Sequence, residues 1–171
     1  MSATSVLWVV LILVALQRAV ESFYAERNTR RLLASGGTEA GASQYPFFLA
    51  LHAGWLVAMA IFIPASRAPN WWLLGLYILL QPLRLWVIAS LGPYWTTRII
   101  TVPNAPLVRR GPYRFVRHPN YILVCTEIAL LPLAFGAIEI AVVFSLLNAA
   151  LLSWRIRVEE HTLSSRQPLS S

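Results

Sequence analysis

Residues 106–121 read PLVRRGPYRFVRHPNY, and this stretch separates two long apolar segments of the chain. Gly111, Pro112 and Pro119 interrupt it, which disfavours a continuous helix. No other stretch of similar length gathers so many polar and aromatic groups. Five of its side chains are candidate site residues: Tyr113, Arg114, Arg117, His118 and Tyr121. We predict that the stretch forms the floor of an active site at a membrane surface.

The composition indicates an integral membrane protein. Hydrophobic residues make up 57% of the 171 residues and charged residues only 12%, whereas soluble domains carry about one quarter charged residues. The net charge of +7 fits either a nucleic acid or an anionic membrane, and the arginines at the ends of apolar segments favour the membrane. We therefore expect one membrane domain over residues 1–171, with 164–171 as a disordered tail, and no nucleic-acid partner.

Five apolar segments are long enough to cross a bilayer, whose core needs about 20 mainly apolar residues. They cover residues 4–20, 46–65, 71–91, 119–135 and 138–154. None alternates between polar and apolar residues, so the backbone is expected to satisfy its hydrogen bonds as helices. The fold class predicted is an all-α polytopic helix bundle with about five transmembrane helices. The last two segments are nearly continuous, which predicts a tight hairpin at Gly136.

The distribution of arginine predicts the orientation of this bundle, because cytoplasmic loops carry the excess of positive charge. Three regions hold almost all the arginines outside the spans: Arg27, Arg30 and Arg31; Arg98, Arg109, Arg110, Arg114 and Arg117; Arg155, Arg157 and Arg166. The other side holds only Arg67. We expect the C-terminus in the cytoplasm, the N-terminus outside and the first segment retained as a helix. All fourteen basic residues are Arg and all seven acids Glu, which points to a GC-rich bacterial genome and a bacterial inner membrane.

Four polar residues inside the predicted spans are singled out as candidates, because such residues are costly in a membrane and often functional. They are His52, Arg84, Glu127 and Asn148. Each lies about 10 Å from the cytoplasmic end of its helix, which predicts a polar layer under a cavity. Arg84 and Glu127 are the natural ion pair; the alternative is that Arg84 snorkels or that the pair only holds helices together. The single Cys125 permits neither an intrachain disulfide nor a cysteine-based metal site.

Two short motifs have an ordinary structural reading when each is taken alone. In His118-Pro119-Asn120-Tyr121, proline fits the first turn of a helix, and His118 would then cap its positive end. In RIRVEE (residues 155–160), Arg155 and Glu159 are four residues apart and share a helix face. The predicted topology puts both motifs on the cytoplasmic side, and that shared location favours a site.

The combination of these motifs is more specific than either motif alone. LVxxGxYxxxRHPxY over residues 107–121, an apolar hairpin, and RxRxEE over 155–160 resemble the isoprenylcysteine carboxyl methyltransferase family, and in particular its short bacterial members. The resemblance is strong over residues 85–160, and the loop NTRRLLASGGTEAGASQYPFFLALH extends it over nearly the whole chain. It implies a membrane-embedded methyltransferase that uses S-adenosyl-L-methionine without a Rossmann domain.

The resemblance also implies roles for individual residues. The cofactor-binding positions it implies are Leu107, Val108, Tyr113, His118, Pro119, Asn120, Tyr121 and Glu159. Arg155 matches the position that contacts the substrate carboxylate or head group. The chain departs from the eukaryotic pattern at Ala105-Pro106 and at Arg98, which stands where a glutamine contacts the cofactor, so no role is carried over to these positions. No metal is implied.

The methyl acceptor is less determined than the cofactor. The family implies a lipophilic or prenylated substrate, and bacterial relatives suggest an alkylpyrone or alkylresorcinol from a type III polyketide synthase pathway. A hydroxyl acceptor would need a base, for which His118 or Glu127 are candidates. Three other functions stay open: a phospholipid N-methyltransferase, a membrane reductase and a non-catalytic membrane scaffold. The first two classes of enzyme share similar C-terminal signatures.

Overall fold

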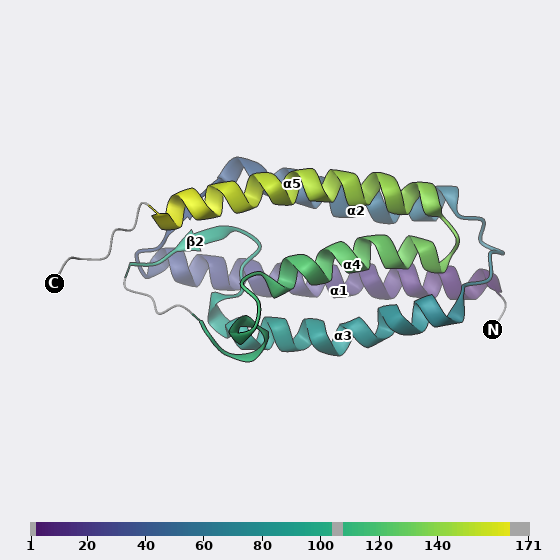
Figure 1. Ribbon diagram of the computed structural model, residues 1–171, viewed down its shortest axis with the longest axis horizontal. Coiled ribbons are helices and arrows are strands. Elements are labelled where there is room, and N and C mark those ends of the chain that lie inside the picture. The colour runs from purple at the N-terminus through teal and green to yellow at the C-terminus, as the bar shows by residue number, and fades with distance from the viewer. Residues whose placement is uncertain (1–2, 104–107, 165–171) are drawn as a thin grey trace.

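The computed structural model describes residues 3–103 and 108–164, and within them the chain is a bundle of helices (Figure 1). The five α-helices are α1 (Ala3–Ala34), α2 (Tyr45–Phe62), α3 (Trp71–Leu91), α4 (Pro119–Ala134) and α5 (Ile138–Ser164). Three 3-10 helices, η1 (Ala42–Gln44), η2 (Gly92–Tyr94) and η3 (Gly111–Arg114), and two strands, β1 (Thr38–Ala40) and β2 (Ile99–Thr101), complete the described elements. Ser164 of the predicted tail ends α5, and residues 165–171 lie outside the described residues.

The helices confirm the predicted all-α membrane bundle and change some of its boundaries. α3 covers residues 71–91 as predicted, whereas α1 continues beyond residue 20 to Ala34 and α5 continues ten residues past Trp154. Within the described residues, four helical segments are long and apolar enough to cross a membrane: Val6–Ala34, Ala42–Phe62, Trp71–Tyr94 and Ile138–His161. α4 is apolar but shorter, with 16 residues, and it lies beside α3 and α5.

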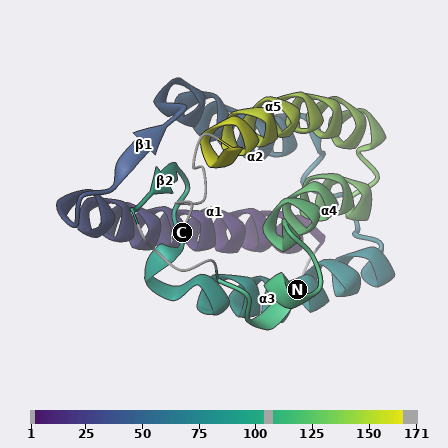
Figure 2. The same cartoon turned by 60° about the vertical axis from the view of Figure 1, so that its left-hand side comes forward.

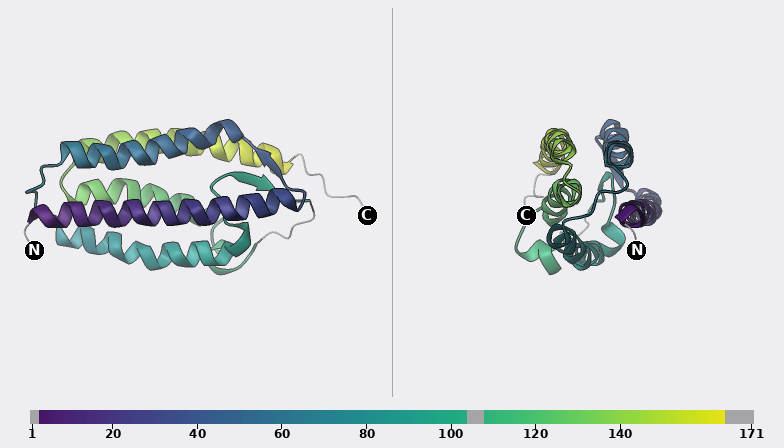
Figure 3. Two further views of the ribbon diagram at one scale, coloured as in Figure 1. Left: turned by 180° about the vertical axis from the view of Figure 1, so that it is seen from behind. Right: turned by 90° about the vertical axis from the view of Figure 1, so that its right-hand side faces the viewer.

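The connections between helices lie at two opposite ends of the bundle (Figures 1 and 3). The α2–α3 connection and the α4–α5 turn lie near the N-terminus, at what we call the turn end. Both strands, η3 and the end of α5 lie at the other end, which we call the ribbon end. The loops and the helix end that were predicted to share one side therefore do lie together.

A two-stranded ribbon at the ribbon end was not predicted from the sequence. β1 pairs with β2 in antiparallel register, with Thr38 opposite Thr101 and Ala40 opposite Ile99. The hydroxyl groups of Thr38 and Thr101 also lie 2.9 Å apart. Figure 2 shows β1 crossing from α1 to α2, so the ribbon ties the loop after α1 to the loop after α3.

The α4–α5 turn confirms the predicted hairpin at Gly136. Gly136 has a φ of +70°, a left-handed conformation that glycine adopts without steric cost. The N–H of Gly136 donates to the Leu133 carbonyl at 2.9 Å, and the N–H of Ala137 donates to the Pro132 carbonyl at 2.9 Å. These two bonds satisfy carbonyls at the end of α4, as in other glycine-terminated helices.

The apolar core lies in the half of the bundle nearer the turn end. Its most buried large side chains come from α1, α2 and α4 and include Leu7, Trp55, Met59, Ile128 and Leu131. The outward faces of the helices are apolar as well, with Ile12 and Leu16 of α1, Phe62 of α2, Ile78 of α3 and Leu146 of α5 all exposed. An apolar exterior of this kind matches lipid rather than water, whereas the polar side chains gather inside the bundle and at the ribbon end.

Candidate active site

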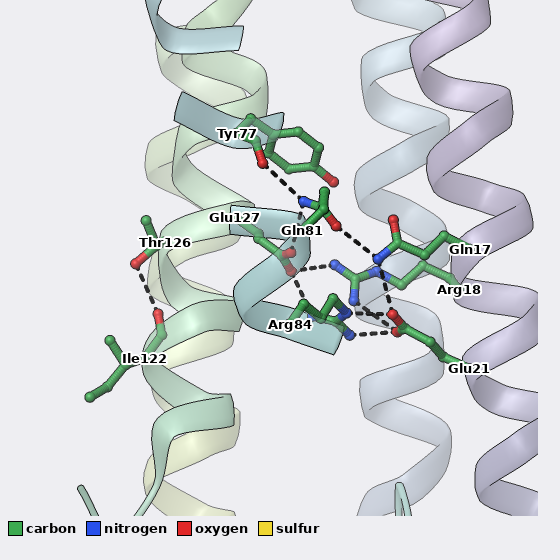
Figure 4. Close-up of polar contacts among 9 residues, drawn as sticks. All are labelled: Gln17, Arg18, Glu21, Tyr77, Gln81, Arg84, Ile122, Thr126 and Glu127. Atoms are coloured by element: carbon green, nitrogen blue, oxygen red, sulfur yellow. Dashed lines mark hydrogen bonds and ion pairs between the residues drawn. The ribbon is translucent and has the colours of Figure 1, made fainter. Parts of the chain in front are cut away.

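The predicted ion pair between α3 and α4 is confirmed. Arg84 Nη1 lies 2.7 Å from Glu127 Oε2, and the two side chains are 5% and 0% exposed. Figure 4 shows the Arg84 and Glu127 side chains pointing toward each other. The burial of the pair excludes the alternative in which Arg84 extends out to the interface.

The first helix completes this pair, which the sequence analysis did not anticipate. Arg18 Nη2 donates to Glu127 Oε2 at 2.6 Å. Arg84 holds Glu21 with two bonds, from Nε at 2.5 Å and from Nη2 at 2.6 Å. The predicted span ended at residue 20, so Glu21 fell outside it, and Arg18, which lies within that span, was overlooked. The signal was present, since residues 17, 18 and 21 are spaced to share a helix face.

Two glutamines close the cluster. Gln17 Nε2 donates to Glu21 Oε1 at 3.0 Å and to Gln81 Oε1 at 2.9 Å. Gln81 Nε2 donates in turn to Glu127 Oε1 at 3.2 Å. We call the following six residues the ion cluster: Gln17, Arg18, Glu21, Gln81, Arg84 and Glu127. Its two positive and two negative charges balance, and every carboxylate oxygen accepts a hydrogen bond, which is what buried charges require.

The other two residues of the predicted polar layer do not join the ion cluster. His52 Nδ1 lies 2.8 Å from the Phe48 carbonyl oxygen of its own helix. Asn148 Nδ2 lies 3.3 Å from Cys125 Sγ, across the α4–α5 contact. The predicted layer drawn from α2, α3, α4 and α5 is thus wrong in its membership, because α1, α3 and α4 supply the paired groups.

The start of α4 has the form predicted from the HPxY motif. His118 is the N-cap, Pro119 is the buried first residue, and the Tyr121 N–H donates to the His118 carbonyl at 3.1 Å. The His118 and Tyr121 rings stack with centroids 5.0 Å apart and planes 8° apart. The motif therefore both begins the helix and presents two parallel rings.

The two sequence motifs meet in space at the ribbon end. Tyr121 Oη donates to Glu159 Oε2 at 2.8 Å, and Arg155 Nε donates to Tyr121 Oη at 2.9 Å. Arg155 Nη1 also donates to the Thr97 carbonyl at 2.9 Å, which attaches α5 to the segment before β2. We call His118, Asn120, Tyr121, Arg155 and Glu159 the site cluster.

Tyr113 lies at the edge of the site cluster. It is half-buried and packs against the small apolar group of Ala25, Val87 and Trp95. Burial raises the pKa of the Tyr113 phenol, and the nearby Tyr121 and Glu159 raise it further, so the phenol stays neutral at physiological pH. Val108 is half-buried in the preceding loop, and the predicted contact Leu107 lies outside the described residues.

The loop before α4 is anchored on the end of α3. Gly111 has a φ of +57°, and a Cβ added there would lie 2.0 Å from Ser90 Oγ, so both conformation and space require glycine. Arg110 Nε donates to the Ser90 carbonyl at 2.8 Å. Arg114 and Arg117 are exposed, and Arg114 lies over the Phe115 ring rather than in the site cluster.

Arg98 is occupied by neighbours that hold the ribbon in place. Its guanidinium lies 3.5 Å from Glu26 and 3.2 Å from Glu39, and 4.7 Å from the centroid of the Tyr45 ring. These contacts join α1, β1 and the start of α2. Arg98 therefore has a structural role in this chain, while Ala105 and Pro106 lie outside the described residues.

The residues of the site cluster fit a nucleoside sulfonium cofactor. Parallel aromatic rings can stack on adenine, and a carboxylate can bind ribose hydroxyls or an ammonium group. Asn120 Oδ1 is buried and has no hydrogen-bond partner among the described residues, so it is an acceptor that a bound ligand would satisfy. In the described part of the chain no group of three or more His, Cys, Asp or Glu side chains could hold a metal ion.

Comparison with known proteins identifies relatives over most of the chain. The sequence model of the isoprenylcysteine carboxyl methyltransferase (ICMT) family matches residues 73–165. The uncharacterized protein YpbQ of Bacillus subtilis is 37% identical over 160 residues, which are 91% of this chain and 95% of that protein. An uncharacterized protein of Haemophilus influenzae is 33% identical over 100 residues, which are 57% of this chain and 58% of that protein. No solved structure matches the chain.

Proposed function

The chain belongs to the isoprenylcysteine carboxyl methyltransferase family, whose membership supports an integral membrane methyltransferase, and on that premise we propose an S-adenosyl-L-methionine-dependent O-methyltransferase. It methylates a carboxyl or hydroxyl group of a lipophilic acceptor at the cytoplasmic face of the membrane. The observation that carries the proposal is the bonded series Arg155–Tyr121–Glu159, which joins the two motifs that were singled out from sequence alone.

The cofactor would supply an electrophilic methyl group on its sulfonium, and the chain would supply position. Glu159 binds the ribose hydroxyls or the ammonium group, while His118 and Tyr121 offer flat rings to the base. Asn120 Oδ1, next to Tyr121 in the chain, adds a buried acceptor. Methyl transfer from a sulfonium is an in-line displacement, so alignment and exclusion of water account for much of the acceleration.

The acceptor would approach from the membrane, with its apolar tail between helices and its head group at Arg155. This arrangement requires the ribbon end in the cytoplasm, with the N-terminus outside and α4 crossing with the four longer helices. The arginine-rich loops at the ribbon end support that orientation. A bacterial inner membrane would be the location, and a type III polyketide synthase product is one acceptor of suitable shape.

Binding of S-adenosylhomocysteine to the detergent-purified protein tests the proposal directly. Calorimetry on the wild type should show binding, and Glu159→Gln and His118→Ala should each weaken it at least about tenfold, equivalent to 1.4 kcal/mol. Glu160→Gln is the matched control, because Glu160 is exposed and adjacent in sequence. If the folded wild type binds no S-adenosylhomocysteine, the protein would instead be assigned as a reductase or as a scaffold. Binding of a nicotinamide cofactor would distinguish the reductase.

Arg155 provides a second test, because it is proposed to contact the acceptor rather than the cofactor. Arg155→Ala should reduce methyl transfer far more than it reduces S-adenosylhomocysteine affinity. Arg157→Ala is the control, since Arg157 is exposed on the same helix. Equal losses of turnover and cofactor affinity would contradict this division of roles.

A further inference from the structure

A cavity of about 480 Å³ lies at the turn end of the bundle, and we call it the turn-end cavity. Phe62 and Val143 line it and are exposed, so it opens on the outer surface of the bundle. None of the described residues of the ion cluster or the site cluster lines it. Its walls come from the last turns of α2, the first turns of α5 and the connections after α2 and α4, and include Ala58, Phe62, Pro64, Gly136, Val143 and Phe144.

The mouth of the turn-end cavity lies at the level where a membrane meets water. α2 ends at Phe62 and α5 begins at Ile138, so both helices have their ends there. Trp71 and Trp72, which begin α3 at the same end of the bundle, are 66% and 87% exposed. Exposed tryptophans are typical of the head-group level of a bilayer. Val143 lies five residues along α5 from Ile138 and therefore about 7.5 Å deeper in the hydrocarbon.

Two exposed side chains of opposite charge, Arg67 and Glu139, also line this cavity. The Arg67 guanidinium lies over the α4–α5 turn, with Nη1 3.9 Å from the position of a Cβ added at Gly136. Among the described residues, none forms an ion pair or a hydrogen bond with the Arg67 guanidinium or with the Glu139 carboxylate. The mouth therefore presents one cation and one anion, and each is available to a ligand.

This order of groups matches a phospholipid with a zwitterionic head group. The phosphate would accept hydrogen bonds from the Arg67 guanidinium, whose planar group of N–H donors suits phosphate oxygens. A primary ammonium would donate to the Glu139 carboxylate, and an acyl chain would lie against the apolar wall. Phosphatidylethanolamine has all three parts. The choline head group has no N–H to donate, and the glycerol head group carries no positive charge.

A lipid in the turn-end cavity is not placed for methylation. Ile138 and Arg155 are 17 residues apart on α5, which separates the mouth of the cavity from the site cluster by about 25 Å. Figures 1 and 3 likewise show the α4–α5 turn and the end of α5 at opposite ends of the bundle. A head group bound at Arg67 is therefore a structural ligand and not a substrate.

We propose that the turn-end cavity binds one phosphatidylethanolamine molecule, with its phosphate on Arg67, its ammonium on Glu139 and part of one acyl chain against Phe62 and Val143. The lipid joins the end of α2 to the start of α5, two elements that the chain itself connects only through α3 and α4. This binding requires a membrane protein but not the proposed methyltransferase activity, so either proposal can fail without the other.

Thermal unfolding of the delipidated protein in detergent measures this binding, because a ligand that binds only the folded state raises the unfolding temperature. Phosphatidylethanolamine should raise the unfolding temperature of the wild type by several degrees. Phosphatidylcholine and phosphatidylglycerol with the same acyl chains should have a much smaller effect. No rise with phosphatidylethanolamine, or an equal or larger rise with either of the other two lipids, would overturn the proposal.

Arg67→Gln and Glu139→Gln each remove one of the two charges. Both side chains are exposed, so both variants should unfold at the wild-type temperature when no lipid is added. Each should lose most of the rise that phosphatidylethanolamine produces. Arg157→Gln and Glu160→Gln are the matched controls, because both residues are exposed at the ribbon end, and these variants should keep the full rise. A full rise in Arg67→Gln and Glu139→Gln would overturn the assigned contacts.

Filling the cavity tests the acyl-chain contact without altering a charge. Val143→Trp should occupy the space against the apolar wall and abolish the rise with phosphatidylethanolamine. Val142→Trp is the control, because Val142 is the adjacent residue, is 52% exposed and does not line the cavity. Equal responses of the two tryptophan variants to phosphatidylethanolamine would overturn the proposed position of the lipid.

Discussion

The ion cluster and the site cluster lie along the same bundle but differ in how completely their polar atoms are paired. In the ion cluster all four carboxylate oxygens accept hydrogen bonds, and the charges sum to zero. In the site cluster the buried Asn120 Oδ1 has no partner among the described residues. Buried polar atoms cost free energy unless they are satisfied. The ion cluster also holds one buried atom without a partner among the described residues, Arg18 Nε, but its charges balance and its carboxylate oxygens are all bonded, which indicates a structural role. Asn120 Oδ1 is instead an acceptor that a ligand could satisfy.

The largest effect should come from removing one charge of the ion cluster. Glu127→Gln leaves Arg18 and Arg84 without a shared counter-charge in a buried place. Breaking a buried ion pair in this way typically costs about 3–5 kcal/mol. Thermal unfolding in detergent should show a correspondingly large fall in stability. Glu139→Gln is the control, since Glu139 is exposed at the start of α5, and an equal loss in both variants would contradict the buried cluster.

Exchanging the charges of Arg84 and Glu127 should fail to restore that loss. In the double variant Arg84→Glu, Glu127→Arg, the new acid at position 84 would face Glu21, and the new base at position 127 would face Arg18. Two like-charge contacts would replace two attractive ones. The unfolding temperature of the double variant should therefore stay as low as that of Glu127→Gln, whereas full recovery would mean that the two residues form an isolated pair.

Two amide residues allow the two clusters to be compared by matched substitutions. Gln81→Met removes an amide whose atoms are all bonded, so it should lower stability by about 1–3 kcal/mol. Asn120→Leu removes an unpartnered buried oxygen, so stability should stay the same or rise, while S-adenosylhomocysteine affinity should fall about fivefold or more. Thermal unfolding would measure the stability of both variants, and calorimetry would measure their affinity for S-adenosylhomocysteine. If Asn120→Leu were less stable than Gln81→Met, the structural role would belong to Asn120 rather than to Gln81.

The smallest effect should follow from Tyr121→Phe. This substitution keeps the ring that stacks on His118 and removes the hydroxyl that links Arg155 to Glu159. Loss of such hydrogen bonds costs about 0.5–1.5 kcal/mol, which is a change of a few-fold to about tenfold in an equilibrium constant. Calorimetry should show that modest loss of S-adenosylhomocysteine affinity with little change in unfolding temperature. A loss as large as that of Glu159→Gln would assign the phenol a direct contact with the ligand.

Much of the fold followed from local patterns in the sequence. The apolar run at 71–91, the glycine at 136 and the His118-Pro119 cap each act within a few residues, and each was confirmed. The end of α1 was missed because a helix continues after the membrane-spanning part ends, through polar residues that no longer mark a span. The ribbon was missed because three-residue strands about 60 residues apart have no local signature.

The sequence indicated which motifs lie at the site, but it did not indicate which of their side chains contact each other. Orientation rules brought the HPxY and RxRxEE motifs to one end, as the structure confirms. The bond between Tyr121 and Glu159 depends on how α4 and α5 are rotated, and periodicity does not determine that rotation. The same limit explains why Glu127 was considered as a base, since only the packed structure shows that both its oxygens are occupied.

The positions of the two clusters along the chain have a consequence for biosynthesis. The ion cluster is complete once residue 127 has been made and α1, α3 and α4 have come together. The site cluster must wait for Arg155 and Glu159, which are on α5. A nascent chain that has reached only the end of α4 would therefore hold its three helices by ion pairs yet lack Arg155 and Glu159. Assembly of the ion cluster can therefore precede that of the site cluster, which only α5 completes.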